Sequence, residues 1–162
     1  MHNKSFLKSL PDEEYRLMVG TGLCAFNQNN GIIVNNILEV DDGRYNWYDL
    51  ISLTSGRLSE RAAKTIAKKC GGTEIPTLFD EIILMRNAIA HSFQVIDDDG
   101  RIIMRHKERI GRHKFGDVDE AYLKEFIKKN IKLAKMLKAF NRRHRNTDRK
   151  GRPNPHANPE DC

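Results

Sequence analysis

The sequence predicts an all-α protein, a helical bundle of four to five helices with one small β-hairpin inserted near residues 93–104. Two observations support this fold class. Apolar residues recur at helical spacing in several long segments, and two short apolar runs flank an Asp-Gly turn. With 162 residues, the chain has room for one ordinary domain and no second full core.

The first predicted helix begins at Pro11–Glu14, because a proline and acidic residues suit the positive end of a helix dipole. Apolar residues then recur with a period close to 3.6 as far as Val40. The polar run Asn27–Gly31 weakens the middle of this pattern. The sequence therefore allows one long helix or two helices joined by a kink, ended by Asp41–Gly43.

Two further helices are predicted in the middle of the chain. The first lies between residues 48 and 70, is best defined over Leu58–Lys69, and is stopped by Gly71-Gly72. The second covers Leu78–His91 and opens with a capping box at Thr77–Asp80. It is apolar over most of its circumference, which is typical of a helix at the centre of a core.

A hairpin and a last helix complete the predicted bundle. Phe93–Ile96 and Arg101–Met104 flank the turn Asp97–Gly100, a pattern that favours two antiparallel strands. Asp117 and Glu120 are predicted to cap the last helix, which extends to about Asn141. Its apolar stripe faces the core, and lysines occupy the opposite face.

The last 22 residues carry half of the net charge of +6. Residues 141–162 hold six basic and three acidic residues and no large apolar side chain, so we expect residues 1–140 to form the bundle and residues 141–162 a disordered tail. The candidate nucleic-acid contacts are Lys128, Lys132, Arg142, Arg143 and Arg145. The alternative is a solvated face and a solubilising tail without a specific partner.

Several classes of protein are not indicated. No stretch approaches the ~18 apolar residues of a membrane span, and the N-terminal residues do not resemble a secretion signal. The three cysteines are far apart, which argues against a disulfide framework and favours a reducing, cytoplasmic location. No group of His, Cys or acidic residues has the spacing of a metal site, so no metal or other cofactor is expected.

Candidate functional residues gather at the end of the helix over 78–91. Arg86 lies among apolar neighbours on the helical wheel, a position that is costly for an arginine unless an anion meets it. Asn87 and His91 are four residues apart and therefore neighbours on one face. His91 falls at the C-terminal end, where the helix dipole favours a positive charge. A cation, an amide and an imidazole are thus expected to converge.

The pattern Arg86-Asn87-x-x-x-His91, near the end of a buried helix in a small all-α domain, resembles the signature of the HEPN superfamily over roughly residues 12–140. Such domains are helical bundles, usually homodimeric, and many are metal-independent endoribonucleases of bacterial toxin–antitoxin and anti-phage systems. The resemblance implies that Arg86 and His91 are catalytic, that Asn87 assists them, and that RNA, a second copy of the chain and an antitoxin or regulatory protein are the partners.

RNA is the expected substrate because, without a metal-bound hydroxide, the substrate's own 2′-OH is the nucleophile, and DNA lacks this group. His91 would shuttle the proton, and Arg86 would stabilise charge on the phosphate. Two alternatives remain open. The chain is a non-catalytic helical module that binds nucleic acid or protein, or Arg86 pairs with a carboxylate such as Glu81 or Glu14 while His91 caps the helix.

Overall fold

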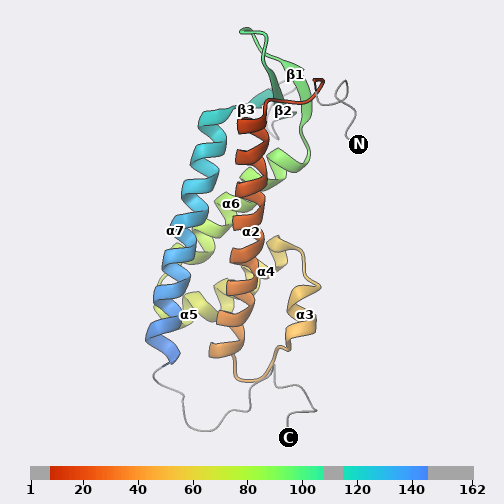
Figure 1. The fold of residues 1–162 in the computed structure, drawn as a ribbon. Coiled ribbons are helices and arrows are strands. Elements are labelled where there is room, and N and C mark those ends of the chain that lie inside the picture. Colours follow the sequence, from red (N-terminus) through yellow and green to blue (C-terminus); the bar gives the residue numbers. More distant parts are fainter. Residues whose placement is uncertain (1–7, 108–114, 146–162) are drawn as a thin grey trace, which may run out of the picture.

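A computed structural model describes residues 8–107 and 115–145. The fold is a helical bundle with a small antiparallel sheet at one end, so the predicted fold class is confirmed (Figure 1). The helical elements are α2 (Glu13–Val40), α3 (Trp47–Ile51), α4 (Ser55–Ala62), the π-helical turn η1 (Ala63–Ala67), α5 (Lys68–Cys70), α6 (Glu74–Ala90) and α7 (Glu120–Arg145). The strands are β1 (Phe93–Ile96), β2 (Ile102–Lys107) and β3 (Phe115–Val118).

Helix α2 is one continuous helix, which decides between the two possibilities that the sequence allowed. Asp12 caps it by accepting a hydrogen bond from the Tyr15 N–H at 2.8 Å. The polar residues in its middle do not break it, because they bond to α7. The buried Asn29 donates from Nδ2 to Oδ1 of Asn130 at 3.0 Å, and Asn36 donates to the Leu137 carbonyl at 3.0 Å.

Helices α2 and α7 lie side by side and run in the same direction (Figure 1). Gly22 faces Phe126, Asn29 faces Asn130, and Asn36 contacts Asn141, so the contacts advance together along both helices. At Gly22 the helices approach closely: a Cβ there would lie 2.6 Å from Cδ1 of Phe126. The glycine is required for this approach, because Phe126 is fully buried and has no room to retreat.

We expect Gly22→Ala to lower the free energy of unfolding by about 1–3 kcal/mol, because the new methyl group overpacks the α2–α7 contact. Gly20→Ala is the matched control, because Gly20 lies in the same helix and a methyl group there would meet nothing within 4 Å. We expect this variant to raise the free energy of unfolding by about 0.5–1 kcal/mol. Urea denaturation of both variants checks this. Equal effects at the two positions would contradict the close approach.

The second predicted helix lies within the expected range of residues 48–70 and begins three residues before its best-defined part. It starts at Ser55, where the Thr54 side chain accepts from the Arg57 N–H at 3.4 Å, and continues through η1 to Cys70. Gly71, with φ +70°, ends it as predicted. The short helix α3 was not predicted, because its residues carry no sustained apolar period.

Helix α6 starts one turn before the predicted position, so the capping box proposed for Thr77–Asp80 is wrong. The reason is that Pro76 lies in the first turn, where its missing N–H breaks no hydrogen bond. The helix ends at Ala90. His91 follows as its C-cap, and its N–H donates to the Asn87 carbonyl at 3.0 Å.

The predicted hairpin is confirmed, since β1 pairs with β2 in antiparallel register, but the sheet also contains β3. Asp117, predicted to cap the last helix, lies in β3 and pairs with Arg105. The cap is Asp119, which accepts from the Tyr122 N–H at 2.8 Å. Helix α7 extends to Arg145, beyond the predicted end at Asn141 and into the segment expected to be a tail. Residues 146–162 lie outside the described residues.

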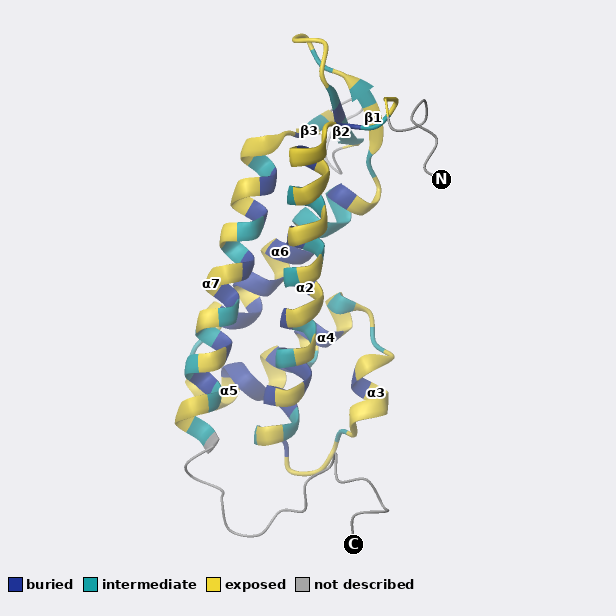
Figure 2. Ribbon diagram, in the orientation of Figure 1, coloured by how far each residue is buried: buried dark blue, intermediate teal, exposed yellow. Residues whose placement is uncertain are grey.

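The Tyr15 side chain joins the sheet to the bundle. Its hydroxyl donates to the Val118 carbonyl and accepts from the Met104 N–H at 3.1 Å, and burial raises its pKa. The buried residues of α2, α4, α6 and α7 belong to one core, and Figure 2 marks the buried positions along these helices. None of the described helices combines the length and apolar composition of a membrane span.

Candidate active site

Arg86 is held on the inner side of α6 by contacts with two other helices. Its guanidinium carbon lies 5.1 Å from the centroid of the Phe26 ring in α2. Its Nη2 donates to Oγ of Ser55, the first residue of α4, at 3.4 Å. The residue is half-buried, and its Nε is enclosed without an acceptor. Arg86 therefore keeps donor capacity that the described residues do not use.

The pairing of Arg86 with a carboxylate, one of the sequence-based alternatives, is wrong for the described residues. Glu81 accepts from Nζ of Lys129 at 2.6 Å, and this hydrogen bond lowers the pKa of Glu81. Glu14 forms no ion pair with Arg86 either. Across residues 8–107 and 115–145, no acidic side chain neutralises the Arg86 guanidinium.

The start of α4 adds further hydrogen-bond donors beside Arg86. The sequence did not predict these donors. Ser55 and Gly56 occupy the first helical turn, where backbone N–H groups have no acceptor within the helix. Gly56 is exposed, and nothing lies within 4 Å of the position that its Cβ would take, so no side chain covers it there. A guanidinium, a hydroxyl and a helix N-terminus together favour an anion such as phosphate. Because Ser55 is 31 residues from Arg86, only the tertiary fold brings them together.

His91 presents its imidazole to solvent at the sheet end of α6. The residue is exposed, and within the described part of the chain its side chain has no hydrogen-bond, ion-pair or ring partner. Asn87 precedes it by one helical turn, is half-buried, and likewise has an unengaged side-chain amide among the described residues. Both groups are therefore available to a ligand, and the imidazole is accessible for proton transfer.

The structure does not join Arg86 to His91 within one chain. Five residues of α-helix correspond to a rotation of about 140° and a rise of about 7.5 Å. Arg86 accordingly faces α2 and α4, whereas His91 shares the outer side of α6 with Asn87 and with Leu84, which is 56% exposed. The expected convergence of cation and imidazole is thus only partial.

The predicted nucleic-acid contacts lie along α7, and the arginines among them lie at its end far from the sheet. Lys128, Lys132, Arg142 and Arg143 are exposed, and only the backbone of Arg145 is described. Nζ of Lys128 lies 3.7 Å from Oε2 of Glu125, whereas Lys132 has no ion-pair partner among the described residues. Helix α7 begins at the sheet, so Arg142 lies roughly 33 Å along it, at the opposite end of the bundle.

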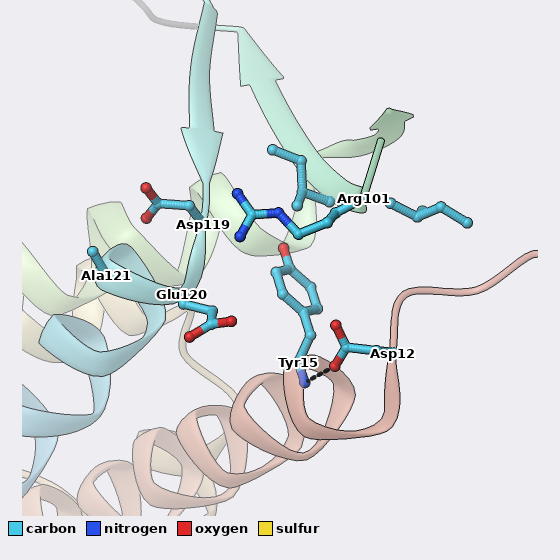
Figure 3. A pocket seen from close by; sticks show the side chains of 8 residues that line it. Asp12, Tyr15, Arg101, Asp119, Glu120 and Ala121 are labelled. Carbon is cyan, nitrogen blue, oxygen red and sulfur yellow. Dashed lines mark hydrogen bonds between the residues drawn. The ribbon is translucent and has the colours of Figure 1, made fainter. Parts of the chain in front are cut away.

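A cavity of about 180 Å³ lies where α2, β2 and α7 meet (Figure 3). Asp12, Asp119 and Glu120 line it, together with Arg101, which is paired with Asp97 at 2.8 Å and Asp99 at 2.9 Å. Arg101 and His106 repeat the spacing of Arg86 and His91, with four residues between arginine and histidine, but the cation of this second Arg-x4-His pattern is neutralised. Three carboxylates around the cavity would repel a phosphate, so the cavity is a poor candidate for binding an anionic ligand.

Comparison of the chain with protein-family models, curated proteins and solved structures finds no match. The resemblance to the HEPN superfamily therefore rests on the Arg86–His91 motif and the helical pattern. Within the described residues, no group of three or more His, Cys or acidic side chains is arranged to hold a metal ion.

Proposed function

We propose that this chain is a metal-independent endoribonuclease. The observation that carries the proposal is Arg86, a half-buried arginine without an acidic partner in the described residues. A charge in that position is costly unless a ligand neutralises it. A phosphate suits the planar donors of the guanidinium, and the Ser55 hydroxyl and the first turn of α4 add donors on the same side.

The reaction we propose is attack of a ribose 2′-OH on the adjacent phosphorus. The O2′–P bond forms and the P–O5′ bond breaks, which leaves a 2′,3′-cyclic phosphate and a 5′-OH. His91 takes the proton from the 2′-OH or returns one to the leaving 5′-oxygen. Arg86 stabilises the charge that builds on the phosphorane oxygens, and Asn87 orients the imidazole or the phosphate.

The experiment that tests this activity is digestion of a single-stranded RNA in excess EDTA, with analysis of the new ends. We expect cleavage to persist and to yield 2′,3′-cyclic phosphate ends. An oligonucleotide of the same sequence with 2′-O-methyl groups should stay intact, because it lacks the nucleophile. Binding of RNA without any cleavage would instead favour the second candidate, a non-catalytic helical module.

We further propose that the active form is a C2-symmetric homodimer. Arg86 and His91 lie on different sides of α6, so one chain offers only part of a phosphate-binding cleft, and a two-fold contact would supply both groups twice. The exposed Leu84, on the same side of α6 as His91, gives this contact an apolar residue. Sedimentation at tens of micromolar is expected to give about twice the 18.7 kDa of the chain. A mass of one chain would contradict the dimer.

The biological role we propose follows from the resemblance to HEPN toxins and phage-defence effectors. An enzyme that cuts RNA without a metal would act on cellular RNA in the cytoplasm, and it would need restraint by an antitoxin or another regulatory protein. Expression of the wild-type chain is expected to slow bacterial growth, whereas expression of His91→Ala should not. Equal growth inhibition by both chains would contradict a toxic role for the cleavage.

A further inference from the structure

Two exposed phenylalanines meet on the surface of the sheet. Phe93 in β1 is 50% exposed and Phe115 in β3 is 47% exposed. Their ring centroids are 6.1 Å apart, with the ring planes at 84°. The outer strands therefore bring together, across β2, two rings that are far apart in the sequence. We call Phe93 and Phe115 the aromatic pair.

The register of the sheet fixes which side chains surround the aromatic pair. Phe93 is opposite Arg105, and Phe115 is opposite Lys107. Residues that face each other across antiparallel strands lie on the same side of the sheet, so both basic side chains flank the rings. Ile103, two residues before Arg105, is buried. On this side of the sheet, the side chain at Ile103 is therefore buried, whereas Lys107, at the other end of β2 and beside the aromatic pair, is exposed to solvent.

The charge beside the rings favours an anionic ligand. Arg105 is neutralised by its hydrogen bonds to Asp117. Lys107, in contrast, is exposed and has no ion-pair partner among the described residues. Two half-exposed aromatic rings beside an ammonium group without an ion pair match an unpaired nucleotide, in which a base stacks and a phosphate is neutralised.

The aromatic pair is also close to the candidate catalytic imidazole. Phe93 follows His91 by two residues, so their Cα atoms are at most about 7 Å apart. A nucleotide stacked on Phe93 would therefore lie beside the exposed His91 side chain. A duplex cannot use such a surface, because its bases are stacked on one another and their faces are hidden.

We propose that the aromatic pair is a stacking subsite for unpaired bases of a single-stranded RNA, which it holds next to His91. This inference rests on the proposed ribonuclease function, and it makes single-stranded RNA the substrate class. The rings bind the bases, Lys107 contacts the backbone, and neither takes part in the chemical step. The competing occupant of these rings is a second copy of the chain, which would bury the same apolar surface.

The test measures binding of a fluorescent, single-stranded 2′-O-methyl RNA oligonucleotide, which the proposed reaction cannot cleave. Phe93→Leu/Phe115→Leu keeps apolar side chains but removes the rings, and we expect it to weaken binding at least about tenfold. Phe93→Tyr/Phe115→Tyr keeps the rings and should bind as wild type does. Ile96→Ala, which trims a side chain that is 72% exposed in the same strand, is the matched control and should change nothing.

An abasic oligonucleotide of the same length and charge identifies the bases as the ligand. We expect it to bind weakly and equally to wild type and to the leucine variant. Unchanged binding of the intact oligonucleotide by the leucine variant would overturn the proposal. Loss of the dimer in sedimentation, with binding per chain unaltered, would also overturn it and make the rings a subunit contact. The probe is not cleaved, so its binding can be measured whether or not the chain is a ribonuclease. If wild type cuts no RNA but binds the probe more tightly than the leucine variant does, the ribonuclease proposal is refuted and the stacking subsite stands.

Discussion

His91→Ala is expected to reduce RNA cleavage by at least about 100-fold, because it removes the group that we propose as the proton shuttle. The same variant should change the free energy of unfolding by less than about 1 kcal/mol. The imidazole is exposed and has no partner among the described residues, and the cap that His91 provides to α6 comes from its backbone N–H. Single-turnover cleavage and urea denaturation measure the two effects.

His106→Ala is the matched control for this variant. His106 lies in β2, half-buried, with its ring 6.3 Å from the Tyr122 ring, and it belongs to the second Arg-x4-His pattern of the chain. We expect this variant to keep wild-type cleavage. If His106→Ala lost activity while His91→Ala kept it, the proton shuttle would be His106 and not His91.

Arg86→Ala is expected to lower cleavage by about 100-fold or more, as removal of a preorganised donor to a developing oxyanion does. The structure also predicts that the variant stays folded. Loss of the contact over Phe26 costs about 0.5–1 kcal/mol, and loss of the hydrogen bond to Ser55 adds little because it is long at 3.4 Å. Removal of the enclosed Nε, which has no acceptor, acts in the opposite direction. The net change should stay within about 1 kcal/mol, whereas a stranded carboxylate would cost about 3–5 kcal/mol.

Arg61→Ala controls for the general loss of an arginine from an aromatic contact. The guanidinium carbon of Arg61 lies 5.4 Å from the centroid of the Tyr45 ring, and the residue is half-buried like Arg86. We expect its removal to leave cleavage unchanged. Arg86→Lys should stay impaired, because an ammonium group lacks the planar pair of donors. Wild-type cleavage by Arg86→Ala would remove Arg86 from the site.

The helices could be predicted where apolar residues recur at helical spacing over a long segment. They were harder to predict where contacts with distant residues determine the local structure. The Asn27–Gly31 run suggests a possible break, yet α2 continues because Asn29 bonds to Asn130, which is 101 residues away in the sequence. Strand β3 escaped prediction because four residues that include Gly116 carry little apolar signal and depend on pairing with β2.

The candidate site was predictable only in part. The helical wheel identified Arg86 as a cation among apolar residues, and the structure places it there, against Phe26. Its neighbour Ser55 could not be found, because no local pattern links residues 31 positions apart. On the helical wheel Arg86 and His91 also point to different sides of the helix. The two groups can therefore meet only if another element completes the site, and we propose that this element is the second copy of the chain.

The central claim is that Arg86 and His91 cut RNA without a metal. Its most direct test compares the wild-type chain with an Arg86→Ala/His91→Ala double variant on the same RNA in excess EDTA, after circular dichroism has shown that both are folded. We expect wild type to cut the RNA and the double variant to leave it intact. A folded double variant that cuts the RNA as fast as wild type would contradict it.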